Sequence, residues 1–212
     1  MEIHSLTLGP FQENTYILVN DQKECILIDP GCYDENDRNR LKEFIDSNGL
    51  TPVKLINTHC HIDHIFGWNF VYETWGLKPY YTEKDQVLVD TAAQHAQMYG
   101  LQMSDLPEAA GYLPEEGFLI WGDDKLEILF CPGHAPGHVC FYHEPSKAVI
   151  SGDVIFRLSI GRTDLPHCKH QDLIDSIKEK IYTLPGDVEL YPGHGPKTTV
   201  DFEMQNNPFV MG

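Results

Sequence analysis

Residues 58–64 concentrate the side chains in this sequence that are best suited to binding metal ions. The segment reads Thr-His-Cys-His-Ile-Asp-His, so three imidazoles and a carboxylate fall within six consecutive positions. On an extended chain, side chains two positions apart share a face, which puts His59 and His61 on the same side. If the chain then turns into a helix, Asp63 and His64 can reach a second ion beside the first. Imidazole and carboxylate ligands suit zinc. A single His is usually structural, but four ligand-type residues within six positions favour metal binding.

Three more residues of the same types follow apolar stretches later in the chain. Each stands just after a predicted strand: His134, Asp153 and His194. The predicted strand 53–57 likewise runs directly into residues 58–64. Strand ends on one rim of a sheet can converge in space even when they are far apart in sequence. The seven residues are therefore predicted to act as one metal-binding set.

The elements that must position this set alternate between strands and helices. Apolar and alternating runs predict strands at 3–8, 15–19, 25–28, 53–57, 119–121, 126–130, 139–142, 148–150 and 188–191. Helical spacing predicts helices at 35–47, with Gly49 just past its end, at 83–101 and at 172–184, whereas 107–117 is expected to be irregular. This order favours an α/β layered fold with its site at strand ends.

Composition limits the class of protein. The chain has 212 residues with 42% hydrophobic content, which suits one compact globular domain with a sizeable core, with two small domains as the alternative. Its formal net charge is −17, and no run of Lys and Arg offsets that charge. A nucleic-acid partner is therefore not expected, because a polyanion would be repelled.

Targeting signals and cysteines point to the cytoplasm. The N-terminal residues lack a basic segment followed by an apolar stretch, so no signal peptide is expected. No window approaches the roughly 18 apolar residues that span a bilayer, so no membrane partner is expected. The six cysteines are scattered, with no Cys-x-x-Cys pair, and are predicted to be free thiols in a reducing compartment.

The motifs resemble those of the metallo-β-lactamase superfamily in both order and spacing, over nearly the whole chain. They are His59-x-His61-x-Asp63-His64, Pro132-Gly133-His134, Gly152-Asp153 and Gly193-His194-Gly195. The opening residues 9–16 and the closing residues 207–209 resemble its glyoxalase II-like (hydroxyacylglutathione hydrolase-like) branch. The resemblance implies a single-domain, four-layer αβ/βα sandwich with two metal ions at the edge between its sheets.

The resemblance also implies a role for each ligand. The first ion takes His59, His61 and His134; the second takes Asp63, His64 and His194; Asp153 bridges the two. Two zinc ions per chain are expected, with iron or manganese as alternatives, and a bridging hydroxide would attack a small thioester such as S-lactoylglutathione. Asp63 and Asp153 are the predicted catalytic carboxylates.

Four further residues are predicted to support the site. Asp29 and His138 are expected to act as hydrogen-bond partners that orient ligands, with direct metal binding as an alternative for His138. Cys60 would bind metal only if extruded, since its side chain should point away from the neighbouring ligands. Arg162 and Asp164 are predicted to bind substrate, because glyoxalase II resembles this region and contacts the glutathione carboxylate with a basic residue there. A structural ion pair between Arg162 and Asp164 is the competing interpretation.

Two departures from glyoxalase II leave the thiol of the substrate undecided. The chain is expected to lack that enzyme's C-terminal helical domain, and Asp164 stands where a substrate-binding Tyr is common. Residues 83–117 are predicted to form a lid or wall that replaces the missing contacts, with Tyr99 and Tyr112 as candidates within it.

Other functions remain open on the same scaffold. The main alternative is a mononuclear iron persulfide dioxygenase, which residues 159–164 also resemble and which would use His59, His134 and Asp153 on iron. A lactonase or a nuclease is less favoured, the nuclease because of the acidic charge. A flavodiiron-type protein would have Glu in place of His61, and a binding module without activity would have lost ligands. The oligomeric state is left open.

Overall fold

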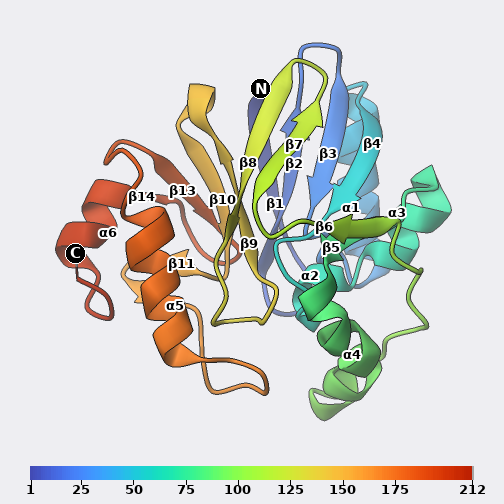
Figure 1. Ribbon diagram of the computed structural model, residues 1–212. Coiled ribbons are helices and arrows are strands. Elements are labelled where there is room, and N and C mark those ends of the chain that lie inside the picture. The colour runs from blue at the N-terminus through green and yellow to red at the C-terminus, as the bar shows by residue number, and fades with distance from the viewer. Residues whose placement is uncertain (212) are drawn as a thin grey trace. The chain divides into compact units, whose positions relative to one another are not determined.

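The computed structural model describes residues 1–211, which divide at Leu113 into two compact units, each built on a six-stranded sheet (Figure 1). The first unit ends at Leu113 and the second begins at Pro114. Each unit carries its own share of the ligand-type residues.

The first unit contains a mixed sheet in the order β1-β2-β3-β4-β5-β6. Its strands are β1 (Glu2–Leu8), β2 (Glu13–Val19), β3 (Glu24–Ile28), β4 (Thr51–Ile56), β5 (Pro79–Thr82) and β6 (Gly111–Leu113). Its helices are α1 (Glu35–Ser47), α2 (Ile62–Ile65), α3 (Trp68–Trp75), the 3-10 turn η1 (Glu83–Asp85) and α4 (Gln86–Met98). Strands β1 to β3 pair antiparallel, and β3 to β6 pair parallel.

Local sequence explains the elements that were predicted in this unit. Every residue of β2 is buried, as are the last four of β3, which suits strands covered on both faces. In α1, Leu41 and Ile45 are four residues apart and buried, and the Asp34 side chain caps the helix by accepting the N–H of Asp37. Gly49 follows the helix with a φ of 63°, a left-handed conformation that glycine adopts readily. The predicted helix over 35–47 is confirmed.

The second unit contains a sheet in the order β14-β13-β10-β9-β8-β7 and a small ribbon of β11 and β12. Its strands are β7 (Gly117–Trp121), β8 (Asp124–Phe130), β9 (Val139–His143), β10 (Ala148–Gly152), β11 (Ile155–Phe156), β12 (Ser159–Ile160), β13 (Glu189–Pro192) and β14 (Thr198–Thr199). Its helices are the 3-10 turn η2 (Glu144–Ser146), α5 (His170–Ser176), the π-helical segment η3 (Ile177–Ile181) and α6 (Val200–Asn206).

The second unit brings two parallel strand ends together beside its core. Leu173, Ile177 and Ile181 of α5 and η3 belong to one buried cluster with residues of β8, β9, β10 and β13, and Figure 1 shows α5 beside that sheet. Strands β10 and β13 run parallel, and the N–H of Gly193 donates to the carbonyl of Gly152 at 2.8 Å. Parallel pairing therefore brings the residues that follow these two strands side by side.

Three of the segments described in the sequence analysis differ in the structure. Residues 107–117 are not wholly irregular, because β6 pairs with β5; three residues are too few to show a period. The predicted helix 172–184 changes to a π-helical segment after Ser176, where the N–H of Tyr182 donates to the carbonyl of Ile177. The predicted helix 83–101 is a 3-10 turn followed by α4, which ends at Met98.

Two further features concern residues 1–211. None of the helices there is both long enough and apolar enough to cross a membrane. All six cysteines are free thiols, as predicted from their scattered positions.

Candidate metal centre

Strand β4 leads into a short loop and then a helical turn, which together contain residues 57–64. His61 occupies the N-cap position of α2 with extended backbone, and the helix starts at Ile62. The rings of His59 and His61 meet edge to face with centroids 4.9 Å apart, so the two lie on the same side. Asp63 falls in the first turn of α2, with its Oδ2 atom 3.8 Å from Nε2 of His64. The chain thus takes the extended-then-helical path on which the proposed reach of Asp63 and His64 depended.

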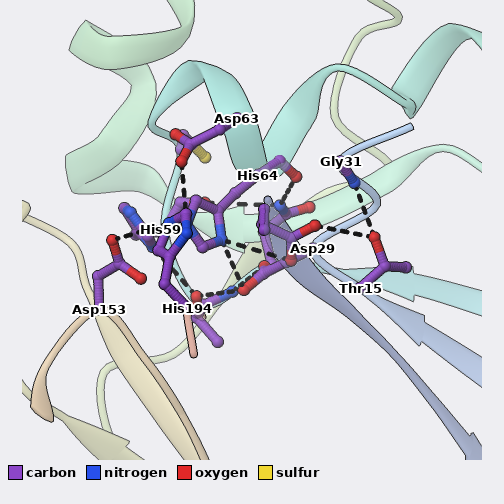
Figure 2. A network of polar contacts seen from close by, with 12 residues as sticks. Thr15, Asp29, Gly31, His59, Asp63, His64, Asp153 and His194 are labelled. Atoms are coloured by element: carbon purple, nitrogen blue, oxygen red, sulfur yellow. Dashed lines mark hydrogen bonds and ion pairs between the residues drawn. The ribbon is translucent and has the colours of Figure 1, made fainter. Parts of the chain in front are cut away.

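Asp29 lies at the end of β3 and faces this loop with a buried carboxylate (Figure 2). It accepts the N–H of Thr58 at 2.7 Å, the hydroxyl of Thr58 at 2.5 Å and Nδ1 of His64 at 3.1 Å. Because the Thr58 hydroxyl donates to Asp29, its oxygen accepts from Nδ1 of His59 at 3.1 Å. Both imidazoles are thereby held in the tautomer whose Nε2 can donate a lone pair to a metal ion.

The backbone at Asp29 is unusual and fits this arrangement. Its φ is 52°, in the left-handed region that Asp tolerates better than most residues. Strain of this kind persists where the surroundings over-determine it, and it occurs often at functional sites. Here three hydrogen bonds to one carboxylate hold the conformation.

Two other buried side chains hold the backbone of the loop. The amide of Asn57 donates to the carbonyl of His64 at 2.8 Å and to that of His59 at 3.5 Å. The Oδ2 atom of Asp85 accepts the N–H of Cys60 at 2.9 Å. Buried backbone groups in irregular segments need such partners, and here one neighbouring side chain and one distant side chain provide them.

Glu13, at the start of β2, lies behind His64. Its Oε1 is 4.0 Å from Nδ1 of His64, and its Oε2 accepts the hydroxyl of Thr15, which in turn accepts the N–H of Gly31 (Figure 2). Burial raises the pKa of Glu13 well above its usual value, against a smaller lowering by His64. A Cβ on Gly31 would lie 2.3 Å from Glu13 Oε2, so glycine makes room for this carboxyl group.

Cys60 is fully buried between two predicted ligands along the chain. Burial raises the pKa of its thiol well above the usual value, and Asp85 and Asp29 raise it further. A thiol, unlike a thiolate, is a poor metal ligand. Among the described residues, the groups of three ligand-type atoms that lie within 4.8 Å of one another do not include the Cys60 sulfur.

In the second unit, Asp153 faces two imidazoles at once. Its Oδ2 atom is 3.4 Å from Nε2 of His134 and 3.5 Å from Nε2 of His194. Asp153 and His134 are buried, whereas the His194 side chain is 28% exposed and so can be reached from solvent. One carboxylate oxygen and two ring nitrogens thus lie close together. The parallel pairing of β10 and β13 places Asp153 beside His194.

The orientation of His134 depends on the backbone of residues 161 and 162. Nδ1 of His134 donates to the carbonyl of Arg162 at 2.8 Å, which directs Nε2 toward Asp153. A Cβ on Gly161 would lie 1.9 Å from the carbonyl oxygen of Asp153 and 3.0 Å from the His134 ring. Only glycine permits the chain to pass here.

His138 lies behind Asp153. Its fully buried ring accepts the backbone N–H of Asp153 through Nε2 at 3.0 Å. This contact is of the kind that the predicted orienting role requires. Direct metal binding by His138, the alternative prediction, would have to use Nδ1.

Arg162 and Asp164 bind each other. The guanidinium donates Nε–H to Oδ1 at 2.7 Å and Nη2–H to Oδ2 at 2.8 Å, a two-point pair on an exposed segment. The hydrogen bonds from Arg162 lower the pKa of Asp164 to about 2. The geometry favours the structural interpretation of this pair over carboxylate recognition.

Several residues that support the site were missed in the sequence. Asn57 and Thr58 directly precede the ligand motif, so their polar side chains after an apolar strand were a usable signal. Glu13 lies in residues 9–16, which the sequence analysis used only for their resemblance to the glyoxalase II-like branch. Asp85 carried no signal, because its partner is 25 residues away in the chain.

The donor set fits metal ions. It consists of five imidazoles and two carboxylates, ligand types that suit zinc and other divalent transition metals: His59, His61, Asp63, His64, His134, Asp153 and His194. In three of these imidazoles Nδ1 meets an oxygen partner, as is usual for histidines that bind metal through Nε2.

Residues 8–194 match the family model described as the metallo-beta-lactamase superfamily. The chain belongs to this superfamily. The match runs through both compact units, so a single metallo-β-lactamase domain accounts for both.

Similar proteins agree with this assignment. Hydroxyacylglutathione hydrolase GloC of Haemophilus influenzae is 34% identical, over 99% of this chain and 98% of its own length. Among solved structures, the BLEG-1 B3 metallo-beta-lactamase is 36% identical with a TM-score of 0.92, over 100% of both chains. TTHA1623 in a di-iron-bound form is also 36% identical, with a TM-score of 0.88, over 98% of this chain and 100% of that one.

These comparisons confirm the predicted metallo-β-lactamase fold and its glyoxalase II-like branch. The protein is an enzyme of a superfamily of metal-dependent hydrolases. Among the described residues, groups of His and Asp side chains lie close enough together to hold a metal ion.

Proposed function

We propose that this metallo-β-lactamase superfamily member is a dinuclear zinc hydrolase of a small acyl thioester, such as S-lactoylglutathione or a related acyl thiol. The observation that carries the proposal is the full-length similarity to GloC, a protein named for hydrolysis of hydroxyacylglutathione. The similarity covers 98% of the length of GloC. GloC, which is named for this activity, is therefore about as long as this chain.

The proposed ligand roles follow the family pattern. His59, His61 and His134 would hold one ion, Asp63, His64 and His194 the other, and Asp153 both. When bound, the pair of ions would lower the pKa of water from 15.7 to about 7 and polarise the scissile carbonyl. No nucleophilic side chain is then required.

The residues around the ligands would keep them in one arrangement. Asp29 holds Nδ1 of His64 directly and that of His59 through Thr58, so each ring presents Nε2. The carbonyl of Arg162 does the same for His134, and His138 fixes the backbone at Asp153. Such partners of metal ligands are typically worth 10- to 100-fold in metal affinity or activity.

The deciding experiment measures metal content and substrate class together. Purified protein loaded with zinc should hold about two zinc ions per chain and hydrolyse acyl thioesters of glutathione in preference to lactones, β-lactams, phosphodiesters and persulfides. Turnover of any other class, with no thioester turnover, contradicts the proposal. One iron per chain with oxygen uptake on a glutathione persulfide would instead establish the dioxygenase alternative.

Metal binding can be checked without turnover. Free zinc at 100 times its dissociation constant should add about 2.7 kcal/mol per site to the free energy of unfolding, measured by urea denaturation with and without a chelator. Equal stability in both conditions contradicts metal binding to the folded chain.

A further inference from the structure

Asp85 is a buried carboxylate outside the predicted ligand set. It is the last residue of η1, stands immediately before α4 and has no exposed surface. A carboxylate removed from water needs hydrogen-bond donors to offset the lost hydration. One of its donors is the N–H of Cys60, 2.9 Å from Oδ2, in the middle of the ligand loop.

The side chain of Asp85 is directed at this loop and not at its own helix. Asp85 occupies the N-cap position of α4, where Asp commonly accepts an N–H from the first turn. Here it makes no such capping hydrogen bond. The positive end of α4 still favours a carboxylate at this position. The hydrogen bond to Cys60 therefore acts on the loop, while the helix contributes a favourable field.

The peptide of Cys60 lies between two predicted ligands. Cys60 belongs to neither strand nor helix, so no sheet or helix ladder fixes the direction of its N–H. That direction decides whether His59 and His61 lie on one side of the chain, and their rings do meet there at 4.9 Å. Fixing the Cys60 N–H consequently fixes both imidazoles.

We propose that Asp85 is a positioning residue for metal binding, which anchors the Cys60 peptide and so holds His59 and His61 together for one divalent metal ion. This inference rests on the proposed function only in taking these two histidines as ligands. It adds to the site a side chain from the segment 83–117, which the sequence suggested only as a lid or wall.

The main test variant is Asp85→Ser. Serine is a good N-cap residue, so α4 is retained, but its shorter side chain cannot reach Cys60. Zinc affinity, measured by competition with a chromophoric chelator, should fall by about 10- to 100-fold. The visible absorption bands of the cobalt-substituted protein should shift as the two imidazoles reorient. Asp85→Asn keeps an acceptor oxygen and should stay within about threefold of the wild type.

A matched control separates positioning from general stability. Asp37 is also buried in the first unit, and its carboxylate accepts the N–H groups of Gly9 and Tyr33. Asp37→Ser should lower the unfolding temperature of the zinc-free protein without changing zinc affinity or the cobalt spectrum. Asp85→Glu, which keeps the charge but displaces the acceptor, serves as a second variant and should weaken zinc binding in the same direction.

The inference is overturned if Asp85→Ser and Asp85→Glu bind zinc as tightly as the wild type. It is also overturned if zinc affinity falls equally in Asp85→Ser and Asp85→Asn. Failure of the proposed function looks different. In that case the wild type itself lacks two bound zinc ions or does not hydrolyse thioesters, whatever residue stands at position 85.

Discussion

The two units of this protein hold their ligand-type residues in different ways. In the first unit, four of them lie within six positions of one segment. Buried side chains hold that segment, one from just before it and two from distant positions: Asn57, Asp29 and Asp85. In the second unit, three ligand-type residues come from three separate strand ends. There the backbone does most of the holding, through parallel pairing, the carbonyl of Arg162 and the close approach of Gly161.

This difference predicts how each half fails. A loop held by side-chain acceptors should loosen when an acceptor is removed, because its backbone and ring N–H groups lose their partners. A set of strand ends held by backbone contact should tolerate loss of side chains but not added bulk. The following predictions are ordered from the largest expected effect to the smallest.

Gly161→Ala should have the largest effect. Its Cβ would lie 1.9 Å from the carbonyl oxygen of Asp153, so the backbone must shift by about 1 Å, a displacement that can reduce turnover about 100-fold. Turnover of the zinc-loaded variant measures this. Gly111→Ala, where a Cβ would meet only the ring of Tyr80 at 3.2 Å, is the control and should remain active. Near-normal activity in Gly161→Ala would show that turnover does not depend on the close approach of residue 161 to the backbone of Asp153.

Asp29→Asn should weaken metal binding by the ligand-type residues of the first unit. Asn tolerates the left-handed backbone, but its amide presents only one acceptor oxygen to the three donors that Asp29 binds. Zinc affinity should fall by about 10- to 100-fold, measured by chelator competition. Asp37→Asn is the matched control. If both variants bind zinc like the wild type, the loop does not depend on this acceptor.

Arg162→Ala should have little effect, although the carbonyl of the same residue orients His134. Ala retains that carbonyl, and the guanidinium is bound to Asp164. We expect kcat, KM and zinc affinity within about threefold of the wild type, since exposed ion pairs contribute little. A KM for a glutathione thioester raised about tenfold or more would instead support recognition of a substrate carboxylate by Arg162.

The smallest effect concerns the titration of Asp164. Its pKa is lowered from 3.8 to about 2 by hydrogen bonds from Arg162. A lowered pKa in the folded state means that the pair favours folding above pH about 4 and loses this contribution as pH falls through about 2. Carboxyl chemical shifts should show this midpoint, and it should return toward about 4 in Arg162→Ala. An unchanged midpoint in that variant would show that the pair is not the cause.

Sequence reasoning succeeded where the chemistry was local. The strands that precede the motifs and the helix over 35–47 followed from spacing and propensity, whereas the turn into α2 was only a condition that the structure meets. The short strand β6 and the π-helical segment η3 did not, because three residues carry no period and an i→i+5 hydrogen bond leaves no distinct pattern.

Supporting residues were predictable only in part. Asp29 and His138 were named as orienting residues, and their hydrogen bonds to Thr58, His64 and Asp153 agree with that prediction. The sequence predicts a role for the side chain of Arg162. In the structure it is the carbonyl of Arg162 that accepts a hydrogen bond from His134. Every residue has a carbonyl, so no sequence pattern marks the one that orients a ligand.

By itself, the sequence determined the donor types, their order along the chain and the superfamily, because His and Asp at strand ends are visible as letters and spacing. The tertiary structure alone decided which nitrogen each His presents, why position 161 must be glycine and what anchors the Cys60 peptide. These depend on directions of N–H groups and on approaches of a few ångströms between residues far apart in sequence. Only the packed chain sets such directions.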